Sequence, residues 1–352
     1  TDEAIQKAGI VNKVVNYIEK EGVGVVVNTG CLPEPSFELL ERLNRNIEKK
    51  YDVYIGLGGG SVLDIAKMLA VMKTNPSNTK SFVGINLLPN KGKPTIMIPT
   101  TSGTGSEVTF NAIFTDEVDN VKKGIVSPYL LPDVAILDPE LTVTCPPGIT
   151  AATGMDAFVH AVESFTSKNA NSITDSMAIH AVKLIYKALP KAVNKGDDIE
   201  ARENMAMGSL LAGMAFSNAG VGAVHALAYP LGGKFKVPHG IANSVLLPYV
   251  LKFNITSVTD KFALIAEAIG ENIEGLTDVQ AAEKMIKLIV DLIKSIGIPN
   301  NIKQFGVSES DIPKMAEEAS KIDRLLRNNP RELSACLPFE IDYETYAGVL
   351  NV

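Results

Sequence analysis

The 352-residue sequence has no tryptophan, only three cysteines and four histidines, and no excess of positive charge. The cysteines, Cys31, Cys145 and Cys336, are scattered and form no CxxC pair, which argues against a cysteine-built metal cluster and favours reduced thiols in a cytoplasmic protein. A formal net charge of −7 gives no basic surface for nucleic acid or an anionic membrane. No apolar run approaches the roughly 20 residues of a membrane-spanning helix. A small molecule is therefore the expected partner.

Length and composition predict a folded protein of two domains. Hydrophobic residues make up 46% of the chain and charged residues 21%, which is typical of a globular protein. Such a chain is too long for one ordinary hydrophobic core. Up to about residue 145, apolar β-branched runs alternate with amphipathic stretches, which predicts an α/β domain whose parallel sheet is covered on both faces. We expect strands at 22–28, 52–57, 95–99 and 133–137, and helices at 36–49 and 62–72.

The pattern changes after the Pro-Pro-Gly segment at 146–148, where strand signals nearly vanish. We therefore expect an α/β domain at 1–146 and an all-α domain at 147–352. The last residues, 334–352, show no helical period and form an atypical tail. Helices are predicted at 153–167, 172–189, 200–216, 221–232, 259–269 and 279–295.

Three of the four histidines belong to one set of candidate metal ligands. Asp156 and His160 are four residues apart, so on a helix they share one face. His225 and His239 lie 14 residues apart, each in a segment punctuated by glycine and proline. One carboxylate and three imidazoles suit Fe(II), Zn(II) or a similar divalent ion. A metalloenzyme is therefore the leading hypothesis.

Two loops rich in small residues indicate a nucleotide site. The first loop, GLGGGS (56–61), follows one predicted strand, and the second loop, PTTSGTGSE (99–107), follows another. Backbone without Cβ atoms can approach phosphate oxygens, and two such loops at the ends of neighbouring strands form a nucleotide crevice. Ser61 stands where the GxGxxG fingerprint has its third glycine, so a tight turn without ligand is the alternative. Asp64 fits a cofactor contact and a surface acid equally well.

Five motifs resemble those of the iron-containing (group III) alcohol dehydrogenases, over residues 1 to about 333. The family implies an N-terminal α/β dinucleotide-binding domain and a C-terminal helical domain that holds the metal. It further implies NAD-linked oxidation of small primary alcohols or diols, or reduction of their aldehydes, by hydride transfer at a Lewis-acid metal, in a homodimer. The motifs are GLGGGSVLDIAK, PTTSGTGSEVT, DPELT, GMDAFVHAVES and HALAYPLGGKFKVPHGIANSVLLPYVLKFN.

The same resemblance implies roles for individual residues. Asp156, His160, His225 and His239 match the metal ligands, with Fe(II) implied and Zn(II) possible from the ligand types alone. Asp2 matches an acid that binds the adenosine ribose, which favours NAD over NADP because a carboxylate repels a 2′-phosphate. The other cofactor contacts implied are Gly59, Gly60, Ser61, Asp64, Thr100, Thr101, Thr104 and Lys122.

The chain departs from the family pattern in three places. Tyr229 stands where many relatives have a histidine assigned to proton relay, and a phenol with an ordinary pKa near 10 is a poorer proton carrier at neutral pH. The family has a first strand before the point where this sequence begins. The tail at 334–352 replaces an expected terminal helix.

Alternatives stay open at this stage. One is a zinc-dependent polyol or glycerol dehydrogenase of the same superfamily, and another is an inactive, truncated family member. Glu163 shares the helix face of Asp156 and His160, which suits either a partner that orients an imidazole or an exposed helix charge.

Overall fold

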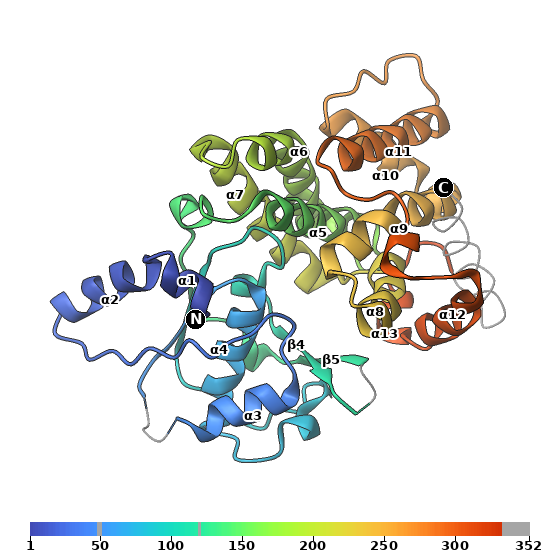
Figure 1. The fold of residues 1–352 in the computed structure, drawn as a ribbon. Coiled ribbons are helices and arrows are strands. Elements are labelled where there is room, and N and C mark those ends of the chain that lie inside the picture. Colours follow the sequence, from blue (N-terminus) through green and yellow to red (C-terminus); the bar gives the residue numbers. More distant parts are fainter. Residues whose placement is uncertain (48–50, 119–120, 333–352) are drawn as a thin grey trace. The chain divides into compact units, whose positions relative to one another are not determined.

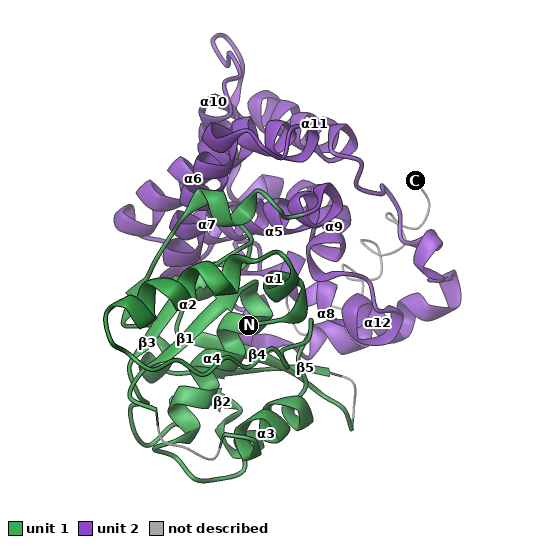
Figure 2. Cartoon of the chain, turned by 60° about the vertical axis from the view of Figure 1, so that its left-hand side comes forward, with its two compact units in different colours: residues 1–145 green, residues 146–352 purple. Residues whose placement is uncertain are grey.

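The computed structural model describes residues 1–47, 51–118 and 121–332, so the predicted tail at 334–352 lies outside the described residues. Figure 1 shows the fold with its helices and strands labelled. The chain forms two compact units, Thr1–Cys145 and Pro146–Val352 (Figure 2). The first unit is α/β and the second is helical, so the predicted fold class is confirmed.

The first unit is built around a parallel sheet with the strand order β1-β3-β6. β1 (Tyr54–Gly58) pairs with β3 (Thr95–Pro99) over five residues, and β3 pairs with the two-residue β6 (Val134–Ala135). The predicted strands at 95–99 and 52–57 correspond to β3 and, with a shift, to β1. The first loop follows β1 directly, and the second loop follows β3. Because the strands are parallel, both loops lie at the same edge of the sheet.

Helices cover both faces of this sheet (Figure 2). On one face, alternate strand residues pack against α2 (Ile10–Lys20), which follows the short α1 (Glu3–Lys7). On the other face, Met97 packs against Leu63 and Ala66 of α4 (Gly60–Met72). Gly56 belongs to this face, and a Cβ on it would lie 2.8 Å from the Met97 sulfur. The apolar residues of the first face are Ile55, Leu57, Ile96 and Ile98.

A second, smaller sheet has the order β2-β5-β4. β4 (Asn111–Asp116) and β5 (Val121–Val126) form an antiparallel pair that the sequence analysis did not predict, and β2 (Gly84–Ile85) adds to it in parallel. α3 (Phe37–Arg45) packs near β4. The strand predicted at 22–28 is wrong: residues 23–28 belong to no ladder, and Val26 is 67% exposed. A run of valines favours extended backbone, but a ladder needs a neighbouring strand.

The second unit contains the remaining α-helices, which are α5 (Pro147–Thr166), α6 (Ser172–Asn194), α7 (Ile199–Ala219), α8 (Ala223–Phe235), α9 (His239–Asn254), α10 (Thr259–Ala268), α11 (Asp278–Ser295), α12 (Ile312–Ser320) and α13 (Asp323–Leu326). The helix α5 is central and packs on α6, α7 and α9. None of the described helices is by itself long and apolar enough to span a membrane; α7 and α8 pass together by length and composition, but the pair is bent by 104°.

Sequence signals explain where several of these helices begin. Pro147 occupies the first turn of α5, where its missing N–H costs no hydrogen bond. Asn171 starts α6 and Thr277 starts α11, each with the reciprocal hydrogen bonds of a capping box. α9 begins at His239 directly after Pro238 and was not predicted, because prolines on both sides of its first half interrupt the helical pattern.

Candidate functional site

Helix α5 supplies two of the candidate metal ligands. Asp156 and His160 stand one turn apart and extend from the same side of the helix. Both are buried, with exposed fractions of 4% and 6%. The His160 ring stacks on the Phe216 ring at a centroid distance of 4.3 Å and on the His225 ring at 4.6 Å. The position of the His160 imidazole is thus set by rings from α7 and α8.

His225 from α8 and His239 from α9 complete the predicted set. His225 is 4% exposed, and the centroids of the two rings are 5.4 Å apart. The start of α9 lies very close to α5, since a Cβ on Gly240 would be 2.0 Å from the carbonyl oxygen of Ala152. Only glycine allows this approach, which carries His239 toward Asp156.

The donor atoms have the spacing of a divalent metal site. Those of Asp156, His160 and His225 lie within 4.8 Å of one another. Asp156 Oδ1 is 3.7 Å from His225 Nε2 and 3.7 Å from His239 Nε2. Ligands about 2.1 Å from a tetrahedral ion are about 3.4 Å apart, so the two separations from Asp156 are close to those around a bound ion. This donor set fits Fe(II) or Zn(II).

Asn243 is a member of the cluster to which the sequence analysis gave no role. Its Nδ2 lies 2.7 Å from Asp156 Oδ1, 3.2 Å from His225 Nε2 and 3.3 Å from His239 Nε2. The side chain is fully buried, and its Oδ1 has no hydrogen-bond partner among the described residues. Asn243 is one turn after His239 on α9, a spacing that the sequence analysis did not use.

The charge of Asp156 is stabilised by its neighbours. Burial alone would raise the pKa of this carboxyl. The nearby His160, His239 and His225, together with the hydrogen bond from Asn243, outweigh burial and lower the pKa to about 2. Asp156 is therefore an anion at neutral pH, the form that binds a metal cation.

Glu163 lies one turn beyond His160 on α5 and is 7% exposed. Its Oε2 is 2.6 Å from His225 Nδ1, and its Oε1 accepts a hydrogen bond of 2.7 Å from the Val224 N–H. The interpretation of Glu163 as a partner that orients an imidazole thus agrees with its contacts, and the interpretation as an exposed helix charge is wrong.

The cluster is most accessible at His239, whose side chain is 28% exposed, against 5% for His225. The Tyr229 ring lies 6.4 Å from the His239 ring. Arg324 of α13 donates a hydrogen bond of 3.3 Å to the Tyr229 oxygen. Sequence reasoning missed Arg324, because its distance along the chain gives no signal of this contact.

In the first unit the two loops touch each other. A Cβ on Gly60 would lie 2.5 Å from Thr104 Oγ1, so the side chain of Thr104 covers Gly60. A Cβ on Gly59 would be 3.5 Å from Thr101 Oγ1, an ordinary contact distance. Gly59 precedes the first turn of α4, where helical N–H groups attract anions. The structure brings the four predicted residues into one place.

Further predicted cofactor residues adjoin this place. The N–H of Thr100 donates to the Gly58 carbonyl at 3.0 Å, which continues the pairing of the two strands into the loops. Ser61 Oγ accepts a hydrogen bond of 3.2 Å from the Glu34 N–H. Lys122 Nζ, on β5, is 3.1 Å from Glu34 Oε1. Ser61 and Lys122 are therefore linked through Glu34.

Asp64 organises the second loop. Its carboxylate accepts hydrogen bonds from Ser106 Oγ at 2.5 Å and from the Ile113 N–H at 2.9 Å, and Lys67 Nζ is 3.2 Å away. Lys67 is 1% exposed, and it also donates to carbonyl oxygens at and just after the second loop. Burial raises the pKa of the neighbouring Glu107 carboxyl to about 7, against the smaller effects of a hydrogen bond within Glu107 and of the Lys67 charge.

Asp2 caps the first helix. Its Oδ1 accepts a hydrogen bond of 3.0 Å from the Ile5 N–H, and its backbone forms a bridge with Gly30. Its predicted contact with the cofactor ribose stays a prediction, as does a direct cofactor contact of Asp64.

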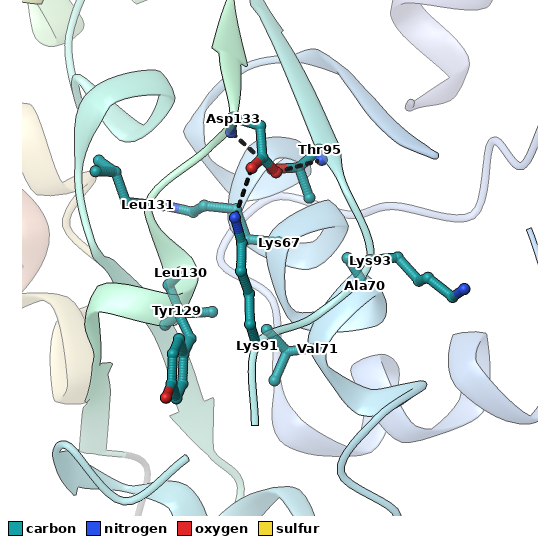
Figure 3. A pocket seen from close by; sticks show the side chains of 10 residues that line it. All are labelled: Lys67, Ala70, Val71, Lys91, Lys93, Thr95, Tyr129, Leu130, Leu131 and Asp133. Carbon is teal, nitrogen blue, oxygen red and sulfur yellow. Dashed lines mark hydrogen bonds and ion pairs between the residues drawn. The ribbon is translucent and has the colours of Figure 1, made fainter. Parts of the chain in front are cut away.

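Figure 3 shows a small pocket of the first unit to which α4 and β3 contribute. Three lysines line it: the charges of Lys67 and Lys91 are engaged, and Lys93 extends away from the other side chains. Lys67 donates to backbone carbonyls, and Lys91 Nζ is 2.7 Å from Asp133 Oδ1. Asp133 also accepts a hydrogen bond of 3.0 Å from the Thr95 N–H. The pocket therefore contributes to the packing of β3 and is no candidate anion site.

A parallel α/β unit with two small-residue loops and a helical unit with a buried carboxylate–imidazole cluster define the class of metal-dependent dehydrogenases. Residues 1–139 match the family model described as iron-containing alcohol dehydrogenase, and residues 150–336 match its C-terminal model. The chain belongs to the iron-containing alcohol dehydrogenase family.

Individual relatives agree with this assignment. The chain is 43% identical to long-chain-alcohol dehydrogenase 1 of Geobacillus thermodenitrificans over 95% of this chain and 85% of the relative. It superposes on the crystal structure of a 1,3-propanediol oxidoreductase with a TM-score of 0.95 and 41% identity, covering 99% of this chain and 91% of that one. A sulfoacetaldehyde reductase from Bifidobacterium kashiwanohense in complex with NAD⁺ gives a TM-score of 0.88 and 32% identity, covering 100% and 90%.

Proposed function

We propose that this chain oxidises small primary alcohols or diols with NAD, and reduces their aldehydes in the reverse direction, at iron held by Asp156, His160, His225 and His239. The observation that carries the proposal is the cluster of one carboxylate and three imidazoles, in which Asp156 Oδ1 lies 3.7 Å from His225 Nε2 and from His239 Nε2 and the exposure is greatest at His239. Family membership supports the reaction class.

Iron bound there supplies a Lewis acid that polarises the substrate oxygen. The residues of this chain supply the surroundings. Asp156 brings the negative charge, and Phe216 covers the ring of His160 and keeps water from it. Since His239 has the most exposed ring of the set, we expect the substrate to approach beside it. Exclusion of water on the buried side strengthens the electrostatic interactions in the site.

Tyr229 is proposed to carry the proton of the alcohol away from the site. Arg324 donates to the Tyr229 oxygen, which leaves the hydroxyl hydrogen available to a second partner. The ring is 6.4 Å from that of His239, so a substrate beside His239 would be near the phenol. A Tyr229→Phe variant should lose more activity at low pH than at high pH, because hydroxide ions, which can take the alcohol proton directly, are scarcer at low pH.

The cofactor is proposed to bind at the two loops of the first unit. Gly59, Gly60 and Ser61 would hold the pyrophosphate at the start of α4, with Asp2 at the ribose as the feature that favours NAD over NADP. The contact of the loops through Gly60 and Thr104 supports this arrangement. The remaining proposed contacts are Asp64, Thr100, Thr101, Thr104 and Lys122.

The substrate class is a proposal that the relatives narrow without deciding. Their names specify long-chain alcohol, 1,3-propanediol and sulfoacetaldehyde. We propose short primary alcohols and diols as substrates, with 1,3-propanediol the first to test. A homodimer and a cytoplasmic location complete the proposal, and light scattering after size-exclusion chromatography would test the former.

The test is anaerobic loading of the chelator-treated protein with Fe(II), followed by NADH formation from a panel of short alcohols and diols. Iron-dependent NADH production is expected, with less or none in the chelated sample. A Zn(II)-loaded sample decides between iron and zinc. Absence of NADH production with every alcohol and both metals would contradict the proposal.

A further inference from the structure

Glu163 uses both oxygens of its carboxylate on the segment that carries His225. Oε2 lies 2.6 Å from His225 Nδ1, and Oε1 accepts the Val224 N–H at 2.7 Å. Glu163 is 7% exposed and His225 is 4% exposed, so water does not compete strongly for these bonds. One carboxylate of α5 thus fixes both the first turn of α8 and an imidazole of α8.

This contact determines which nitrogen of His225 carries the hydrogen. A carboxylate is only an acceptor, so Nδ1 must be the donor, and in the neutral imidazole Nε2 then keeps its lone pair. Nε2 is the atom that faces Asp156 Oδ1, at 3.7 Å. Asn243 Nδ2 is 3.2 Å from the same Nε2, a distance at which an amide donor meets a lone pair. Glu163 at Nδ1 and Asn243 at Nε2 therefore favour the tautomer that can bind a metal through Nε2.

The linker before α8 is closely packed against Glu163. A Cβ on Gly222 would be 3.3 Å from Glu163 Oε1 and 3.2 Å from Asn329 Oδ1, so Gly222 is packed between them. Asn329 is held in turn by Asn254: each amide nitrogen donates to the other oxygen, at 2.8 and 3.0 Å. The segment that contains Asn329 thus packs against the linker at Gly222.

We propose that Glu163 is a positioning residue that holds His225 in the Nδ1–H tautomer and thereby sets the affinity of the site for its metal. The proposal rests on the proposed function only in taking His225 as a ligand. The tautomer itself is a property of the protein before metal or substrate binds, so it is measurable without turnover.

The first experiment reads the tautomer directly. The full chain is labelled with ¹⁵N in histidine and treated with chelator, and two-bond ¹H–¹⁵N correlation spectra are recorded. Only four imidazole rings contribute signals, and the signals that disappear in a His225→Gln variant are those of His225. The wild-type protein should show His225 with a protonated Nδ1 and an unprotonated Nε2. A protonated Nε2 would overturn the proposal.

The Glu163→Gln variant then tests the cause. Glutamine keeps an acceptor for the Val224 N–H, but its amide group donates to His225 Nδ1, which moves the hydrogen to Nε2. We expect the tautomer to invert and Co(II) affinity, followed by the visible absorption of the bound ion, to fall about 10- to 100-fold, the usual effect of removing the partner of a ligating histidine. An unchanged tautomer with unchanged Co(II) affinity would overturn the proposal.

Ser164→Ala is the matched control. Ser164 is the next residue on α5 and is also buried, and its hydroxyl donates to the Ala161 carbonyl of the same helix. It should leave the tautomer and Co(II) affinity unchanged. If Glu163→Gln proves unstable in thermal unfolding, the wild-type tautomer still decides. A wild-type protein with the expected tautomer and Co(II) binding but no NADH formation would contradict the proposed reaction and leave the role of Glu163 standing.

Discussion

The two units build their candidate sites by opposite means. In the second unit, side chains from three helices converge in a buried core, where Asp156 and His160 are held by rings and by Asn243. In the first unit, the site is made at strand ends by residues with little or no side chain, and Gly60 lies directly under Thr104. The metal site depends on the donor atoms of side chains, and the cofactor site depends on glycines that have no side chain.

This difference teaches what kind of substitution each unit tolerates. Removing a side chain should empty the metal site but leave the loops of the first unit as they are. Adding one carbon should block the loops but leave the metal ligands in place. Variants that separate metal binding from NADH binding therefore test the comparison.

His239→Ala should have the largest effect. It removes a proposed ligand, and the loss in metal affinity should exceed the roughly 100-fold upper range seen when only the partner of a ligand is lost. Metal analysis after dialysis and NADH fluorescence measure the two sites on one sample. NADH affinity should stay at the wild-type value, and turnover at the wild-type rate would contradict the ligand assignment.

Gly240→Ala tests how the metal unit is packed. The new Cβ would meet the Ala152 carbonyl at 2.0 Å, so α9 must move away from α5. We expect a loss of about 3 kcal/mol in the free energy of unfolding, at the upper end of overpacking effects, together with weaker metal binding. Gly148→Ala is the control, since nothing lies within 4 Å of its Cβ. Equal stability of the two variants in urea would show that the close approach is unimportant.

Glu107 predicts a pH dependence of the first unit. Its pKa is about 7 in the folded protein against 4.5 for the ordinary carboxyl, chiefly because it is buried. Between these values the folded state keeps a proton that the unfolded state releases, so stability falls as pH rises through this window. Glu107→Gln should therefore gain about 2 kcal/mol relative to wild type on going from pH 5 to pH 7. If the difference in the free energy of unfolding between the two proteins were the same at pH 5 and at pH 7, this account would be contradicted.

Gly59→Ala and Gly60→Ala compare two glycines of one loop. Alanine at position 59 fits the protein, because its Cβ would be 3.5 Å from Thr101 and the backbone φ of −74° suits any residue. It should weaken NADH binding about tenfold, or about 1.4 kcal/mol, without loss of stability. Alanine at position 60 would displace Thr104 and should lower both the NADH affinity and the stability of the protein. If Gly59→Ala bound NADH with wild-type affinity, the cofactor phosphates would not bind at Gly59, and this assignment would be contradicted.

Asp2→Asn should have the smallest effect. Asparagine still accepts the Ile5 N–H that Asp2 now accepts, so the helix cap is kept while the charge is removed. NADP use relative to NAD, measured as the ratio of kcat/KM values, should rise a few-fold. An unchanged ratio would show that Asp2 does not face the ribose.

The sequence predicted the fold where local pattern and tertiary pairing agree. β3 was recognisable because a short apolar run ends in a threonine-rich loop, and α4 because a helical pattern follows a glycine-rich loop. The strand at 22–28 was predicted from its valines, but no pattern within those residues specifies whether a partner strand lies beside them. The β4–β5 pair was missed because its polar residues hide the alternation of buried positions.

The candidate site was predictable where it uses residue types that are rare in this chain. The chain has only four histidines, and three of them lie in motifs that also contain glycine or an acidic residue, so they stood out as candidate ligands. Asn243 and Arg324 are common residue types whose meaning comes from a position in space. The roles of Asp64 and Lys67 in fixing the second loop likewise depend on contacts across about 40 residues, which periodicity does not reveal.

The most direct test of the central claim is anomalous diffraction at the iron edge from crystals of the Fe(II)-loaded protein. The account predicts one strong peak per chain, within bonding distance of an Asp156 oxygen and of ring nitrogens of His160, His225 and His239. A peak at any other place, or no peak in protein that oxidises alcohols, would contradict it.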